Sequence, residues 1–126
     1  MNEIKTFEDA CEKLGISPEE FKITYPDKLG TKFGKSMQAH AKLVIIALAL
    51  NDGWEPNWGD FSEYKYFPWF DFERNSTADT GFGFSYFVWA YSNSCTFVGA
   101  RLCFKTSELA KYAGTQFTDL YRDYMV

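Results

Sequence analysis

The sequence lacks the residue groupings on which metal centres, nucleotide sites and triad hydrolases depend. Histidine occurs once, at His40, inside an apolar stretch where we expect a structural role. The three cysteines, Cys11, Cys95 and Cys103, include no CxxC pair, so we expect reduced thiols and no zinc site. The run Gly81-Phe82-Gly83-Phe84 lacks the lysine and the following helix of a phosphate loop. The sequence therefore predicts no catalytic residue, no metal and no cofactor.

An excess of positive charge and a long apolar run are also lacking. The formal net charge is −4, whereas binding through phosphates needs clustered Lys and Arg, so nucleic acid is not the expected partner. The longest apolar stretch, residues 43–50, falls short of the roughly 20 residues that span a bilayer. No apolar run follows a basic start, as it would in a signal peptide. Together with reduced thiols, these features predict a cytoplasmic protein.

Aromatic residues are what the sequence has in abundance. They make up 20% of the 126 residues, and all four tryptophans lie within residues 54–104. A packed aromatic side chain buries about 150–250 Å², so a few of them suffice for a small core. A chain of this length fits one domain with one core. We therefore expect a single domain over residues 1–126.

Local signals predict four helices. Thr6 as N-cap, Asp9 and Gly15 at the other end predict a short helix over residues 6–14. The capping box Ser17-Pro18-Glu19-Glu20 predicts a second short helix that must end before Tyr25-Pro26-Asp27. The two long helices are expected over residues 35–51, with a broad buried stripe, and over residues 107–124, capped by Thr106. The stripe of the first long helix consists of Met37, His40, Ala41, Val44, Ile45 and Leu48.

Three aromatic-rich segments between the long helices read as strands, at residues 64–73, 82–91 and 96–104. Pro68 removes a ladder donor and predicts an edge strand or a bulge. Short polar connections favour antiparallel neighbours. The expected fold class is α+β: a three-stranded antiparallel β-meander packed with two long helices and a short N-terminal helical pair.

The expected strands carry aromatic residues at odd and even positions, so both faces of the sheet would be aromatic. One face can supply a core, and the other must be covered by the chain itself, a partner or a ligand. The face that mixes aromatic and charged side chains is predicted to bind a partner. Its residues are Phe67, Trp69, Phe87, Trp89, Tyr91 and Arg101.

Two alternatives remain open for this face. The loop at residues 53–63 or the N-terminal helices could fold over it, in which case its residues are core. Arg101 could hold an anion, or it could form an ion pair with Asp71 or Glu73 and stack on a tryptophan.

The preferred interpretation is a non-enzymatic interaction domain that binds a protein partner or itself through the aromatic face. An alternative is a small-ligand or nucleic-acid-strand binder that stacks bases or rings on Trp and Tyr. A third is a small hydrolase with paired carboxylates beside tryptophans. Those carboxylates are Asp52, Glu55, Asp60 and Glu63, next to Trp54 and Trp58.

Three segments carry a resemblance to a known group of proteins. They are Tyr66-Phe67-Pro68-Trp69-Phe70, residues 98–106, and Tyr112-Ala113-Gly114-Thr115-Gln116-Phe117 with Leu120-Tyr121. In these the chain resembles small proteins encoded by gut Bacteroidetes bacteria and their phages. The resemblance implies a bacterial or phage origin and a mobile-element setting. The expected location is the host cytoplasm, with association with a virion as a further expectation. It implies no catalytic or binding residue.

Overall fold

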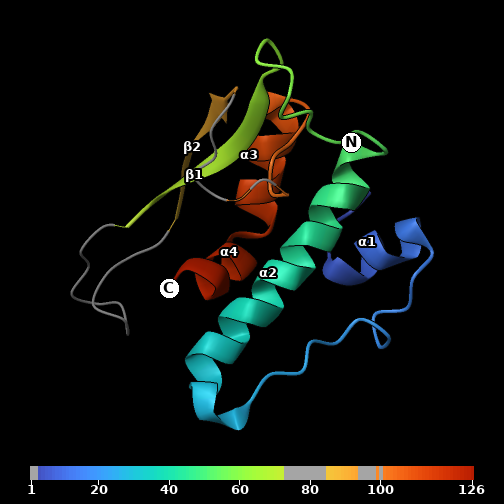
Figure 1. Ribbon diagram of the computed structural model, residues 1–126, viewed down its shortest axis with the longest axis vertical. Helices are drawn as coiled ribbons and strands as arrows, with labels where there is room; N and C mark the ends of the chain where they lie inside the picture. The colour runs from blue at the N-terminus through green and yellow to red at the C-terminus, as the bar shows by residue number, and fades with distance from the viewer. Residues whose placement is uncertain (1–2, 73–84, 94–98, 100) are drawn as a thin grey trace. The chain divides into compact units, whose positions relative to one another are not determined.

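The computed structural model describes residues 3–72, 85–93, 99 and 101–126 (Figure 1). The chain divides into two compact units, which are described separately below. The first unit is Met1–Glu55 with Asp119–Val126, and the second is Pro56–Thr118. The expected α+β class is confirmed, because helices accompany an antiparallel strand pair. The elements are α1 (Phe7–Leu14), η1 (Asp27–Leu29), α2 (Gly30–Asn51), β1 (Lys65–Asp71), β2 (Ser85–Ser92), α3 (Ser107–Gln116) and α4 (Thr118–Met125).

Helix α1 begins and ends where the local signals predict. The Thr6 hydroxyl accepts from the Asp9 amide at 3.0 Å, and the Asp9 carboxylate accepts from the amides of Thr6 and Lys5. This reciprocal capping box satisfies amides that the first helical turn leaves without partners. Gly15 ends the helix at φ 73°, a left-handed conformation that costs little without a Cβ atom.

The expected second short helix is absent from the described residues, and this prediction was wrong. The Ser17 hydroxyl bonds to the Glu19 carboxylate at 2.9 Å, while the amides of Glu20 and Phe21 bond to the carbonyls of Ser17 and Pro18. A capping box needs the serine to accept from the backbone three residues on. Here the serine engages a side chain instead, and the segment forms a turn and then runs extended.

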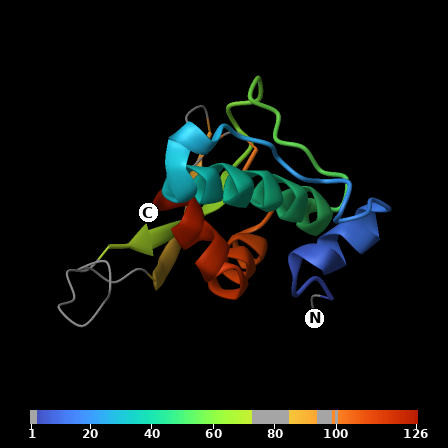
Figure 2. The same cartoon turned by 90° about the horizontal axis from the view of Figure 1, so that it is seen from below.

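Helix α2 is the main buried helix of the first unit, and α1 packs against it (Figure 2). It starts at Gly30, five residues before the expected position. The expected stripe is wrong in part, because Leu48 is 44% exposed and Met37 is exposed as well. The buried apolar side chains are Ala39, Ala41, Leu43, Ile45, Ile46, Ala47, Ala49 and Leu50. An apolar helix offers several possible stripes, and tertiary packing selects one of them.

The expected helix 107–124 is two helices, α3 and α4. Phe117 breaks it with φ −113° and ψ 30°, outside the helical region. In the first unit, α4 contacts α2 through the Tyr124 ring, which stacks on His40 at 4.9 Å between centroids. The Ser36 hydroxyl donates to the Tyr124 carbonyl at 2.6 Å. His40 is thus a partly buried ring packed on a neighbour, and its structural role stays a prediction.

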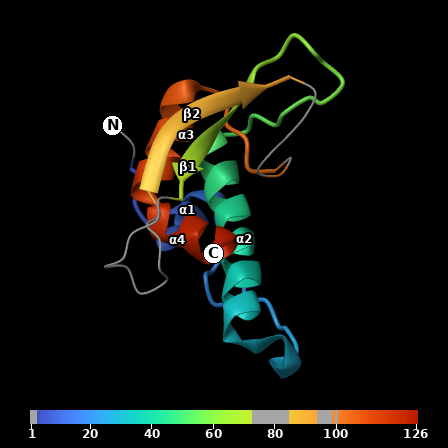
Figure 3. The same cartoon turned by 90° about the vertical axis from the view of Figure 1, so that its left-hand side faces the viewer.

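The second unit is built on the antiparallel pair β1–β2, which is curved and has α3 alongside it (Figure 3). The register pairs Tyr66 with Tyr91 and Pro68 with Trp89. It shifts between Trp69 and Phe70, so that Phe87 has no partner on β1. Such a bulge in the pair is what a proline in a strand suggested, although the extra residue lies on β2.

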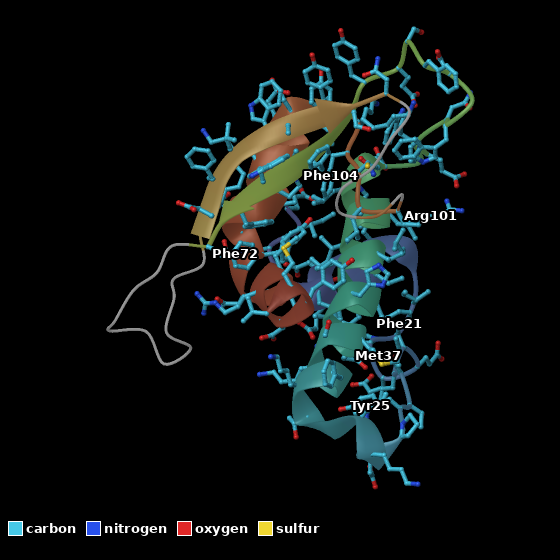
Figure 4. The ribbon with its side chains drawn as sticks, turned by 60° about the vertical axis from the view of Figure 1, so that its left-hand side comes forward. Phe21, Tyr25, Met37, Phe72, Arg101 and Phe104 are labelled. Carbon is cyan, nitrogen blue, oxygen red and sulfur yellow. The ribbon has the colours of Figure 1, made fainter. Side chains whose placement is uncertain are left out.

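The expected third strand is not a strand where the structure describes it, at residues 99 and 101–104. These residues form a turn that ends in a single antiparallel bridge between Phe104 and Tyr66. Phe104 therefore lies beside β1, not beside β2 as a meander requires (Figure 4). The three-stranded meander is corrected to a two-stranded sheet with one bridge. Residues 96–98 and 100 of that prediction lie outside the described residues.

Helix α3 approaches the strand pair closely at Gly114. A Cβ atom on Gly114 would lie 2.7 Å from the Cβ atom of Pro68 and would overlap the Tyr86 ring. Only glycine permits this approach. Cys103 and Cys11 are buried thiols, each in its own unit, whereas Cys95 lies outside the described residues. Burial raises the pKa of the Cys11 thiol, as expected for an inert small apolar residue.

Candidate binding surface on the strand pair

Four aromatic rings form a continuous cluster at the end of the strand pair where β1 begins and β2 ends. We call Tyr64, Tyr66, Trp89 and Tyr91 the aromatic cluster. Tyr64 and Tyr91 stack with centroids 4.5 Å apart, and Tyr66 meets Trp89 edge-on at 5.4 Å. Tyr66 also contacts Tyr64 and Tyr91, each at 6.3 Å. These distances fall within the 4.5–7 Å range of favourable ring pairs, so the cluster is a packed unit.

The strand register explains why these rings meet. Directly opposed residues of an antiparallel pair share a face, and so do residues two apart on one strand. Tyr66 opposes Tyr91, and Trp89 lies two residues from Tyr91 on β2. Tyr66 also directs its backbone amide and carbonyl to Phe104, at 3.0 and 2.6 Å, and so away from β2. The Tyr66–Tyr91 pair is therefore of the closer, non-hydrogen-bonded kind, which brings side chains together.

The cluster is packed internally and still reaches solvent. Tyr64 is 47% exposed and Tyr91 51% exposed, and Trp89 is exposed as well. Phe87 is exposed at the bulge of β2, whereas Trp69 and Val88 are exposed on the opposite face of the strand pair. A contiguous apolar patch such as the aromatic cluster marks an interaction surface more often than single exposed residues do.

The predicted grouping of Phe67 and Trp69 with Trp89 and Tyr91 on one face is wrong. The register places Phe67 and Trp69 on the opposite face, where Phe67 opposes Ala90. Phe67 is 1% exposed and belongs to the core, whereas Trp69 is 45% exposed. Alternation along one strand shows which of its residues share a face. It does not show which residues of the next strand lie on that face, because this depends on the register between the strands.

The remaining predicted site residues are Phe87 and Arg101. Phe87 is exposed at the bulge of β2. Arg101 is exposed in the turn before Phe104 and does not lie on a strand with the cluster. Of the predicted residues, the structure thus brings together Trp89 and Tyr91. It adds Tyr64 and Tyr66, which are not among the predicted site residues.

Lys65 supports the cluster from the other face and was missed in the sequence. Its side chain is 0% exposed. Its Nζ atom donates to the carbonyls of Asp60, Glu63 and Asn93, at 2.8, 3.2 and 3.0 Å. It also lies 3.4 Å from the Glu63 carboxylate. A buried ammonium needs such partners, and here they tie the loop before β1 to the residue after β2.

The same ammonium lies 5.0 Å from the centre of the Trp58 ring. This cation–π contact places a tryptophan of the loop over the charge. The Asn93 side chain adds a bond from Nδ2 to the Phe61 carbonyl at 2.7 Å. Loop and strand pair are therefore joined at the end that carries the aromatic cluster.

The carboxylates considered for a hydrolase have structural partners. The Asp60 carboxylate accepts from the hydroxyl and the amide of Ser62, which lowers the pKa of Asp60. The Glu63 carboxylate accepts from the Asn57 amide at 2.8 Å and pairs with Lys65. In the first unit, Asp52 lies 3.4 Å from Lys13. These contacts are typical of loop turns and a helix end.

A groove also lies within the first unit. It has a volume of about 500 Å³ and lies between α1, the extended segment and α2, in the region of Phe21 and Tyr25 (Figure 4). Lys42 lies 5.3 Å above the Phe7 ring at its edge. The lining of this groove mixes acidic and basic side chains with aromatic ones and includes neither histidine nor cysteine.

No cluster of metal-ligating side chains occurs in the part of the chain that the structure describes. None of the helices among those residues is both long and apolar enough to cross a bilayer. Comparison with protein-family models, curated proteins and solved structures found no match.

Proposed function

We propose that this chain is a non-enzymatic interaction domain that binds a protein partner through the aromatic cluster. The observation that carries this proposal is the cluster itself: four rings in mutual contact that remain partly exposed. Tyr and Trp supply large contact areas at a low cost in side-chain entropy, and they are enriched at binding hot spots.

The support beneath the cluster favours binding as well. The buried Lys65 fixes the loop that leads to Tyr64 and the end of β2 next to Tyr91. A surface whose rings are already held in place loses less entropy on association than a mobile one. The origin implied by the resemblance, a bacterium or its phage, remains part of this proposal, as does a site of action in the host cytoplasm.

Stacking of a small planar ligand or a nucleic-acid strand is the alternative use of the same rings. The stacked pair Tyr64–Tyr91 already covers one surface of each of these two rings. The net charge of −4 opposes a phosphate backbone. Both features favour a protein partner over a nucleic-acid strand.

The test compares Trp89→Ala and Tyr91→Ala with the wild type, and uses Phe33→Ala as the matched control. Phe33 is an exposed aromatic residue of α2, outside the cluster. We expect each cluster variant to weaken association by about 2 kcal/mol, roughly thirtyfold in Kd, and the control to bind like the wild type. Association is measured by sedimentation for self-binding and by titration for a captured partner.

Thermal melting of the same samples separates loss of binding from loss of fold. The proposal predicts cooperative melting of both cluster variants. Unfolded cluster variants, or cluster variants that associate as strongly as the wild type, would contradict it.

A further inference from the structure

The two edges of the strand pair differ in chemistry. β1 contains Pro68 and Asp71, and Phe104 bridges its outer edge at Tyr66. Proline, charge and a covering segment are devices by which natural proteins protect a sheet edge. β2 has the sequence Ser-Tyr-Phe-Val-Trp-Ala-Tyr-Ser, without charge or proline. No strand among the described residues pairs with its outer edge.

The contacts of Tyr66 identify which backbone groups of β2 face outward. Tyr66 bonds to Phe104, so the Tyr66–Tyr91 pair makes no ladder bond, and bonding alternates along the pair. The Pro68–Trp89 pair is then also non-bonded, consistent with the missing amide hydrogen of proline. The amides and carbonyls of Trp89 and Tyr91 consequently point to the open edge, whereas those of Ala90 point to β1.

We propose that the open edge of β2 pairs antiparallel with β2 of a second copy of the chain, about a twofold axis at Ala90. In this register Trp89 opposes Tyr91 of the copy, and each of the two pairs exchanges two backbone hydrogen bonds. This inference rests on the proposed function, because it names the partner of the aromatic cluster. Trp89 and Tyr91 belong to the cluster, so the clusters of both copies would become continuous across the axis.

Side-chain charge and size along β2 favour a second copy as the occupant. The net charge of −4 opposes contact between two copies in general, and this opposition is least where neither strand carries a charge. The run Val88–Ser92 is uncharged and lies beyond the bulge at Phe87, where the strand is regular. Ala90 has the smallest side chain of the run, and it stands where the two strands come closest. An isologous contact also needs only one self-complementary surface.

Amide hydrogen exchange followed by NMR tests the pairing directly. The amides of Trp89 and Tyr91 should gain about tenfold or more protection as the protein concentration rises through the dimer Kd. The Ala90 amide, which bonds to β1 within the chain, is the internal control and should be protected at every concentration. Equal exchange of Trp89 and Tyr91 at low and high concentration would overturn the inference.

Disulfide trapping provides a second, independent test in a Cys95→Ser background. Ala90→Cys should form a dimer on mild oxidation, since opposed residues of a non-bonded pair have Cα atoms about 4.5 Å apart. Val88→Cys is the matched control on the same strand and face. In the proposed register the two copies of residue 88 are four positions apart, about 13 Å, so it should remain monomeric. Trapping by both variants or by neither would contradict the register.

The outcomes also separate this inference from the proposed function. A monomeric protein that binds another protein in a way that Trp89→Ala abolishes would overturn the β2 pairing and support the proposed function. A dimer that Ala90→Cys traps and Trp89→Ala leaves intact would support the pairing and contradict the role of the cluster.

Discussion

The Tyr64 ring lies on the Tyr91 ring with centroids 4.5 Å apart and planes 19° from parallel. The two residues belong to the two strand ends that the buried Lys65 ties together, through the Glu63 and Asn93 carbonyls. The ring pair on one face and the ammonium on the other thus hold the same end of the sheet. A two-stranded sheet is marginal alone, so such additional contacts are needed to keep it ordered.

The ring pair should contribute measurable stability. We expect a double-mutant cycle with Tyr64→Ala and Tyr91→Ala to give a coupling free energy of about 0.5–1.5 kcal/mol, the usual worth of an aromatic pair. Urea unfolding of the four proteins supplies the values. A second cycle that combines Tyr64→Ala with Phe87→Ala is the control, and its coupling should be near zero. Equal coupling free energies in both cycles would show that the ring contact is not the source of the coupling between Tyr64 and Tyr91.

Lys65 should be the most sensitive polar residue of the second unit. Lys65→Met removes the donor from three carbonyls and leaves Glu63 without its charged partner, so we expect a loss of about 3 kcal/mol of unfolding free energy. Ser92 opposes Lys65 in the register, and its buried hydroxyl has no hydrogen-bond partner among the residues that the structure describes. Ser92→Ala should therefore be neutral or slightly stabilising. Chemical denaturation measures the unfolding free energies of both variants. A Lys65→Met protein as stable as Ser92→Ala would contradict the role of Lys65 in holding the end of the sheet.

Two leucines of α2 provide a matched test of its packing. Leu43 is 2% exposed and Leu48 44% exposed. Leu43→Ala should cost about 2–4 kcal/mol through lost burial and a cavity, whereas Leu48→Ala should cost less than about 1 kcal/mol. Thermal and urea unfolding measure the difference. Similar losses in both variants would mean that the helix buries a different face.

The features of the fold that could be predicted are those that local sequence determines. Thr6, Asp9 and Gly15 set the ends of α1 through contacts within a few residues. The face of α2 that becomes buried could not be predicted in the same way, because apolar residues surround most of that helix. The break at Phe117 lacks a proline and could not be read from the sequence.

The candidate site was predictable in composition but not in arrangement. Trp89 and Tyr91 were identified by their residue type and their place on one strand. Their actual neighbours, Tyr64 and Tyr66, follow from the register, and a shift of one residue would exchange the faces. Lys65 carried no signal at all, since a lysine at the start of a strand is ordinarily exposed and its three acceptors come from loops.

The capping box of α1 makes a pH-dependent contribution to stability. The amides of Lys5 and Thr6 and the Thr6 hydroxyl lower the pKa of the Asp9 carboxyl below its ordinary value of 3.8. A carboxyl with a lowered folded-state pKa stabilises the fold above 3.8, and this stabilisation is lost as the pH falls through the lowered value. Asp9→Asn should therefore be less stable than the wild type at about pH 7, and the difference should shrink toward about pH 2.5. Urea midpoints at both pH values measure this. Glu8→Gln removes the same charge from the same helical turn and is the control. Should Asp9→Asn differ from the wild type equally at both pH values, the ionised capping box would not be the source of the stabilisation.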